Sequence, residues 1–213
     1  MSWDDIPSWS ADVAKAILLS VKEKDPHTFY HCLRVGRVSR QLAKAMGLNE
    51  FEQAVLEFSG MFHDVGKVGI PDSVLLKPGR LDQHEVELMK SHPMKSSAII
   101  EPLAKTSFFR FTLPGIRYHH EKIDGTGYPF AIAGEKIPLS ARVISVVDTF
   151  DAMSYSRPYR NALPLEKVQQ ELIDFSGTQF DAAIVRTFMQ LLPHLNKEEN
   201  KDEIAIAKIL KVA

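Results

Sequence analysis

The stretch ARVISVVDTFDAM, residues 141–153, decides the fold class because it is apolar nearly all round. A helix with apolar residues on nearly every side is buried at the centre of a globular protein. Elsewhere in the chain, apolar residues recur mostly at helical rather than strand spacing. We therefore expect an all-α protein in which residues 141–153 form a central helix.

Capping signals predict where the other helices begin and end. Asp25 precedes a proline, which is typical of a helix start, and Asn49 and Asp82 each open a capping box with a glutamate three residues later. We expect His92 to end the helix that Asp82 begins, because a proline follows it. The expected helices cover residues 10–24, 25–47, 49–64, 82–92, 141–153, 165–175 and 181–192, with one turn near residue 74.

Composition indicates an ordinary globular protein. The 213 residues suit one domain, and 26 basic against 27 acidic side chains leave a net charge of -1. No global field therefore attracts polymeric nucleic acid or an anionic membrane. The single cysteine, Cys32, excludes an internal disulfide, and no apolar run reaches the roughly 18 residues of a membrane span. We expect a cytoplasmic protein without membrane insertion.

Glycines and prolines dominate residues 121–138, EKIDGTGYPFAIAGEKIP. This composition cannot form a regular helix and predicts a long loop. Long loops inside compact domains are usually functional.

Histidines and aspartates gather at helix ends and on buried faces. His31 lies four residues before a buried valine and shares its helix face, with His27 one turn further back. Successive side chains on a helix diverge by about 100°, so His63 and Asp64 can face different metal ions, and Asp64 could bridge them. Asp148 lies inside the apolar helix and needs a cation, a helix cap or a proton. Each residue alone also has a purely structural interpretation, but together they predict a shared metal site.

Four segments carry a resemblance: FHDVGKVGIPDSVLLKPGRL (62–81), HHEKIDGTGYP (119–129), IPLSARVISVVDTFDAMSYSRPYR (137–160) and SGTQFD (176–181). They resemble the HD-GYP family of cyclic di-GMP phosphodiesterases, a branch of the HD phosphohydrolase superfamily. The similarity runs from about residue 25 to 188. We expect a lead-in helix over 1–24, a compact HD-domain fold over 25–193 with the loop near the metal site, and a charged tail with a short helix over 194–213.

The resemblance implies two divalent ions, iron or manganese, and hydrolysis of cyclic di-GMP to pGpG or GMP by a metal-bound hydroxide. Asp64 and Lys67 would be catalytic, with Lys67 against the scissile phosphate. Arg157 and Arg160 would contact phosphate and guanine. Tyr128 would contact substrate, brace the loop, or meet a diguanylate cyclase domain. The implied metal ligands are His31, His63, Asp64 and Asp148 for one ion, and His92, His119 and His120 for the other, with Asp64 bridging.

The chain departs from three-metal relatives of this family, which have glutamate where His27 stands. We therefore expect two ions, although His27 could ligate a third. Two alternatives stay open: a phosphohydrolase for another cyclic dinucleotide or nucleotide, and a non-catalytic cyclic di-GMP receptor or partner-binding module.

Overall fold

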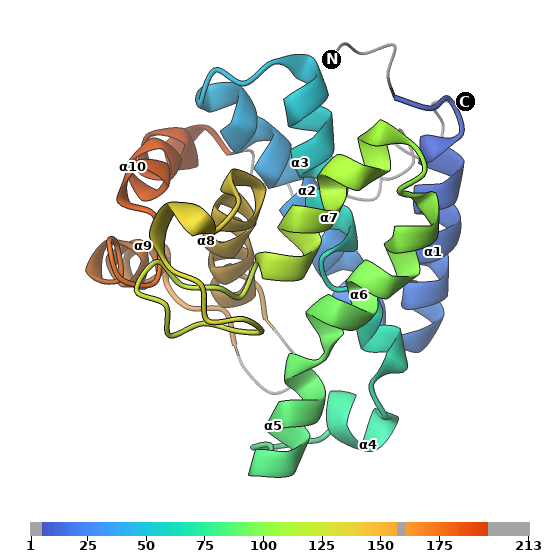
Figure 1. Ribbon diagram of the computed structural model, residues 1–213. Coiled ribbons are helices and arrows are strands. Elements are labelled where there is room, and N and C mark those ends of the chain that lie inside the picture. Colours follow the sequence, from blue (N-terminus) through green and yellow to red (C-terminus); the bar gives the residue numbers. More distant parts are fainter. Residues whose placement is uncertain (1–5, 157–160, 196–213) are drawn as a thin grey trace.

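A computed structural model describes residues 6–156 and 161–195, and these residues form an all-helical fold (Figure 1). In this part of the chain the one β-type pairing is an isolated bridge between Ser176 and Phe180. The predicted fold class is confirmed. The α-helices are α1 Ser10–Lys24, α2 Pro26–Ala45, α3 Glu50–Phe62, α4 Asp72–Leu75, α5 Gln83–Lys90, α6 His92–Ile100, α7 Ser107–Tyr118, α8 Leu139–Ser154, α9 Leu165–Asp174 and α10 Ala182–Leu191, and the 3₁₀ helices are η2 Val65–Gly69, η3 Glu101–Leu103, η4 Gly134–Lys136 and η5 Leu192–His194.

Helix α8 is the buried centre of one half of the molecule, as its sequence predicts. Val143, Ile144 and Val147 are fully buried, and α2, α9 and α10 pack around them (Figure 1). The helix is not apolar on every side, however. Ser145 and Asp148 lie on a face that lines a cavity.

Helix α2 joins two apolar clusters. Its later turns pack with α8, while Phe29 and Cys32 pack with α1, α3 and α7. Where α2 crosses α3, Gly36 faces Gly60 so closely that a Cβ on Gly60 would lie 2.8 Å from the Cα of Gly36. Side chains at either glycine would force the helices apart. This close crossing sets the distance between His31 on α2 and the end of α3.

The segment between residues 83 and 118 differs from the prediction. α5 ends at Lys90, and His92 begins α6 instead of ending the helix before it. Proline is tolerated in the first turn of a helix because its missing N–H would have no partner there, so Pro93 marks a helix start. The predictions also contain no helix over residues 107–118, where α7 carries Pro114 in its interior.

The predicted loop over residues 121–138 is confirmed, with η4 its one helical turn. The carboxylate of Glu121, in a residue only 2% exposed, accepts backbone hydrogen bonds from Phe130 (2.7 Å) and Ile132 (3.1 Å). Ile123 and Asp124 donate backbone hydrogen bonds to the turn that precedes α10. Contacts within the loop, and contacts with the turn before α10, therefore hold the loop in place beside the end of α7. No helix in the described ranges is long and apolar enough to cross a membrane.

Candidate metal centre

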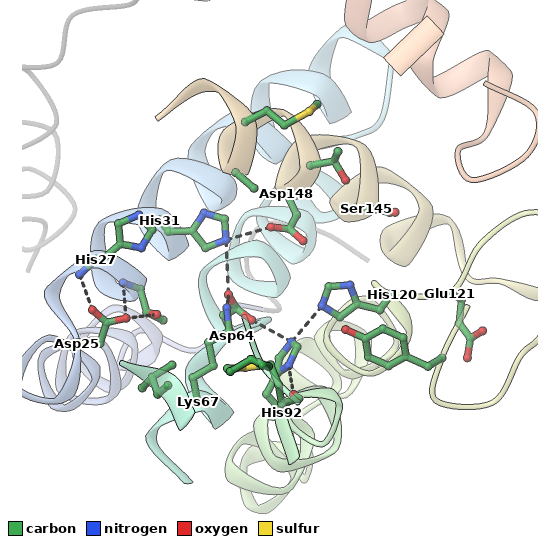
Figure 2. A pocket seen from close by; sticks show the side chains of 18 of the residues that line it. Asp25, His27, His31, Asp64, Lys67, His92, His120, Glu121, Ser145 and Asp148 are labelled. Carbon is green, nitrogen blue, oxygen red and sulfur yellow. Dashed lines mark hydrogen bonds and ion pairs between the residues drawn. The ribbon is translucent and has the colours of Figure 1, made fainter. Parts of the chain in front are cut away.

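Side chains from α2, η2, α6, α8 and the 121–138 loop line a cavity (Figure 2), whose volume is about 600 Å³. Its volume lies within the range of small-molecule sites, about 300 to 1,000 Å³. Its polar lining includes His31, Asp64, Lys67, His92, His120, Tyr128 and Asp148. Five of these seven residues are expected metal ligands.

One group of ligand atoms lies between α2, the end of α3 and α8. The Nε2 atom of His31 is 3.2 Å from Nε2 of His63, 3.5 Å from Oδ2 of Asp64 and 3.0 Å from Oδ1 of Asp148. His63 Nε2 is itself 3.4 Å from Asp64 Oδ2. These four residues are the expected ligands of one ion, and the fold brings them together.

A second group lies where α6 meets the end of α7. His92 Nε2 is 3.3 Å from His119 Nε2 and 3.1 Å from His120 Nε2. The other oxygen of Asp64, Oδ1, lies 3.0 Å from His92 Nε2. Asp64 thus presents one oxygen to each group. The groups adjoin, since ligand atoms of His63, His119 and Asp148 also lie within 4.8 Å of one another.

The histidine tautomers favour metal binding. Nδ1 of His63, His92 and His119 lies 2.7, 2.7 and 2.8 Å from the carbonyl oxygen three residues earlier. A carbonyl only accepts, so each Nδ1 carries the hydrogen, and in the neutral form of such a ring the lone pair of Nε2 points into the site. These carbonyls belong to the last turns of α3, α5 and α7, where they accept no hydrogen bond from a residue four positions later within the same helix. Several lone pairs and carboxylates therefore meet in one buried volume, an arrangement that a cation stabilises.

The pKa values of several buried groups in the site are far from their usual ranges. Burial alone would raise the pKa of Asp64, but Lys67 and the neighbouring imidazoles hold it well below its usual range. The pKa of Asp148 is also well below its usual range, because His31 outweighs the effect of burial. Burial lowers the pKa of His120 to about 3, which keeps this ring neutral. Both carboxylates are thus anions at neutral pH.

His31 differs from the other histidines because its Nδ1 meets a carboxylate, Asp151 Oδ2, at 2.6 Å. Arg34 donates to both oxygens of Asp151, at 2.7 and 2.8 Å. Burial would lower the pKa of His31, but Asp148 and Asp151 raise it to about 9. The sequence interpretation missed Asp151 and Arg34. The position of Asp151, three residues after Asp148 on the same helix, is the signal that could have found the aspartate.

Of the other expected site residues, three line the cavity and two cannot be placed. Lys67, just after Asp64 in η2, makes a 2.5 Å ion pair with Asp64 Oδ2. Tyr128 stacks on His120 with ring centroids 4.6 Å apart, and burial raises the pKa of its hydroxyl. His27 lines the cavity but belongs to none of the candidate ligand groups in the described residues. Arg157 and Arg160 lie outside the described residues.

The HD domain family matches residues 12–184 of this chain. A cyclic di-GMP phosphodiesterase of Thermotoga maritima is 35% identical over 180 residues, which cover 84% of this chain and 49% of that protein. The 3'3'-cGAMP-specific phosphodiesterase 3 of Vibrio cholerae is 34% identical and covers 81% of this chain and 38% of that protein. The chain therefore belongs to the HD domain family, as the resemblance predicted. It spans about half or less of the length of these relatives.

A solved structure supports the fold. The crystal structure of a cyclic GMP-AMP-specific phosphodiesterase of V. cholerae, V-cGAP3, superimposes with a TM-score of 0.61 at 19% identity. The alignment covers 85% of this chain and 48% of that one. Members of the HD domain family bind divalent metal ions, and the His and Asp groups described above have the donor types for such ions.

Proposed function

We propose that this chain is a metal-dependent phosphodiesterase that hydrolyses cyclic di-GMP to pGpG or GMP. The observation that carries the proposal is the placement of Asp64, with Oδ1 against His92 and Oδ2 against His63. A carboxylate so placed is suited to bridge two cations. The proposed ligands are His31, His63, Asp64 and Asp148 for one ion and His92, His119, His120 and Asp64 for the other.

When bound, two divalent ions such as iron or manganese neutralise phosphate charge and lower the pKa of water. The residues of the chain contribute binding and positioning. Lys67 Nζ lies beside Asp64 at the cavity wall, where its positive charge would attract a phosphodiester. Tyr128, stacked on His120, forms an adjoining wall and holds that imidazole in place. We assign Arg157 and Arg160 to substrate binding from the sequence alone.

Cyclic di-GMP is the first candidate substrate because the Thermotoga relative is named for it and the similarity covers most of this chain. A second candidate is 3'3'-cGAMP, since the Vibrio relative at 34% identity is specific for that molecule. The two differ in one purine base. The choice between them therefore depends on base contacts and not on the metal groups.

The diguanylate cyclase partner stays a prediction. Tyr128 is half-buried against His120, whereas the neighbouring Phe130 is 51% exposed. We propose that any partner domain contacts Phe130, while Tyr128 braces the metal site.

The test is a side-by-side assay on protein purified without oxygen. Metal content per chain is measured in the same sample that is incubated with cyclic di-GMP and with 3'3'-cGAMP, and products are separated by chromatography. We expect close to two metal ions per chain and faster turnover of cyclic di-GMP than of 3'3'-cGAMP. If the protein holds its full complement of metal but leaves both nucleotides unhydrolysed, the result would instead support a non-catalytic receptor.

A further inference from the structure

The four histidines with a defined Nδ1 partner are oriented in two different ways. His63, His92 and His119 use backbone carbonyls in the last turns of α3, α5 and α7. His31 lies inside α2, where the carbonyls of the preceding turn accept the hydrogen bonds of the helix itself. His31 therefore needs a side chain from another element, and Asp151 of α8 provides it.

We propose that Asp151, clamped by Arg34, is the positioning residue that holds His31 in the tautomer with its Nε2 lone pair in the metal site. This inference rests on the proposed function only in requiring a metal beside His31. A carboxylate behind a ligating imidazole fixes the ring orientation and raises its basicity as a ligand.

The hydrogen bonds around Asp151 require a carboxylate and not an amide. Oδ1 accepts from Nε of Arg34, while Oδ2 accepts from Nη2 of Arg34 and from Nδ1 of His31. Three N–H groups thus point at two acceptor oxygens. An asparagine has one acceptor oxygen and one NH₂ donor, so either orientation of its amide sets a donor against another donor. One orientation faces the amide NH₂ toward His31 and favours the wrong tautomer.

The aromatic ring of Tyr155 in turn holds Arg34 in place. Its guanidinium lies 3.8 Å from the centroid of the Tyr155 ring, next to the end of α8. The side chains of Arg34 and Asp151 are only 11% and 4% exposed. A planar, two-pronged donor held by stacking fixes both oxygens of Asp151, which lysine cannot do with a single ammonium. The series Tyr155, Arg34, Asp151 and His31 therefore connects the end of α8 with the metal site.

The test compares Asp151→Asn with Glu57→Gln. Glu57 on α3 accepts a 2.6 Å hydrogen bond from Arg40 of α2, so this control also removes a partly buried carboxylate that pairs with an arginine of α2, but away from the cavity. Mn²⁺ is titrated into the metal-free proteins and the free ion is counted by electron paramagnetic resonance. We expect Asp151→Asn to weaken one of two binding sites by about 10- to 100-fold. Glu57→Gln should leave both sites unchanged.

A spectroscopic readout separates positioning from simple stabilisation. In Zn²⁺-loaded wild type, the long-range ¹H–¹⁵N spectrum of the histidines should show His31 with hydrogen on Nδ1. That signal should be lost in Asp151→Asn and kept in Glu57→Gln. Unchanged Mn²⁺ affinity and an unchanged His31 signal in folded Asp151→Asn would overturn the proposal.

Arg34→Lys provides a second variant and carries the test alone if Asp151→Asn does not fold. It keeps the positive charge and the Asp151 carboxylate but loses the two-pronged contact, so we expect a smaller weakening of the same site. Unchanged affinity would contradict the role of the clamp. Wild type that binds two Mn²⁺ without hydrolysing any cyclic dinucleotide would refute the proposed function and leave this inference intact.

Discussion

The Oδ1 oxygen of Asp64 lies 3.0 Å from Nε2 of His92, while Oδ2 of the same carboxylate faces the opposite group of ligands. Asp64 follows the C-cap of α3, and His92 is the first residue of α6. Their contact connects the two groups of candidate ligands into a single centre.

Asp64→Asn should remove the bridge, because an amide is neutral and has only one acceptor oxygen. We expect metal content to fall from near two to one or fewer per chain and hydrolysis to fall by at least about 100-fold. Metal analysis and a turnover assay check this. Asp174→Asn, which changes an exposed carboxylate on α9, is the control and should retain both properties. Full activity in Asp64→Asn would contradict the assigned role.

Gly66→Ala should separate η2 from α6. A Cβ at Gly66 would lie 2.3 Å from both the carbonyl oxygen of His92 and the amide nitrogen of Ser96. Backbone must move to relieve such contacts, at a cost of about 1–3 kcal/mol in the free energy of unfolding. Urea unfolding measures this loss. Gly69→Ala meets only the flexible end of Lys95 at 3.2 Å and should cost much less; equal losses would refute the explanation.

Metal removal should destabilise the fold, because it leaves the imidazole lone pairs and carboxylates facing one another. A ligand at 100 times its dissociation constant stabilises by about 2.7 kcal/mol, or roughly 5 to 10 °C in Tm for a chain of this size. We expect chelation to lower Tm by that amount and Mn²⁺ to restore it. Calorimetric scans provide the measurement. Identical Tm values with and without metal would show that the folded protein gains nothing from an ion.

Glu121→Gln should loosen the loop that carries Tyr128. The carboxylate accepts hydrogen bonds from the amides of Phe130 and Ile132, whereas glutamine has one acceptor oxygen for the two. We expect faster hydrogen exchange at these two amides and about 1–3 kcal/mol less stability. Glu135→Gln, on an exposed residue of the same loop, is the matched control. Equal exchange in both variants would exclude a role for Glu121 in holding the loop.

Local capping and periodicity rules predicted the elements that carry three of the seven proposed ligands. Asp25 and Asn49 cap α2 and α3 as their sequences indicate, and the apolar run over 141–153 lies within α8. These elements set the positions of His31, His63 and Asp148. The predictions succeeded here because capping and apolar periodicity act over a few residues.

The misses have two physical causes. Prolines conceal α6 and α7, since Pro93 stands at a helix start and Pro114 is tolerated inside a helix. Asp151 was missed because its partner His31 lies 120 positions earlier in the chain. The spacing of Asp151 from Asp148 places both aspartates on α8, but only the packing of α2 against α8 brings Asp151 into contact with His31.

Anomalous diffraction from crystals of Mn²⁺-loaded protein would test the bridging role of Asp64 most directly. We predict two peaks about 3.5 to 4 Å apart, each within bonding distance of a different oxygen of Asp64. The first peak should lie beside His31 and the second beside His92. A single peak, or two peaks of which neither touches Asp64, would contradict the proposed binuclear centre.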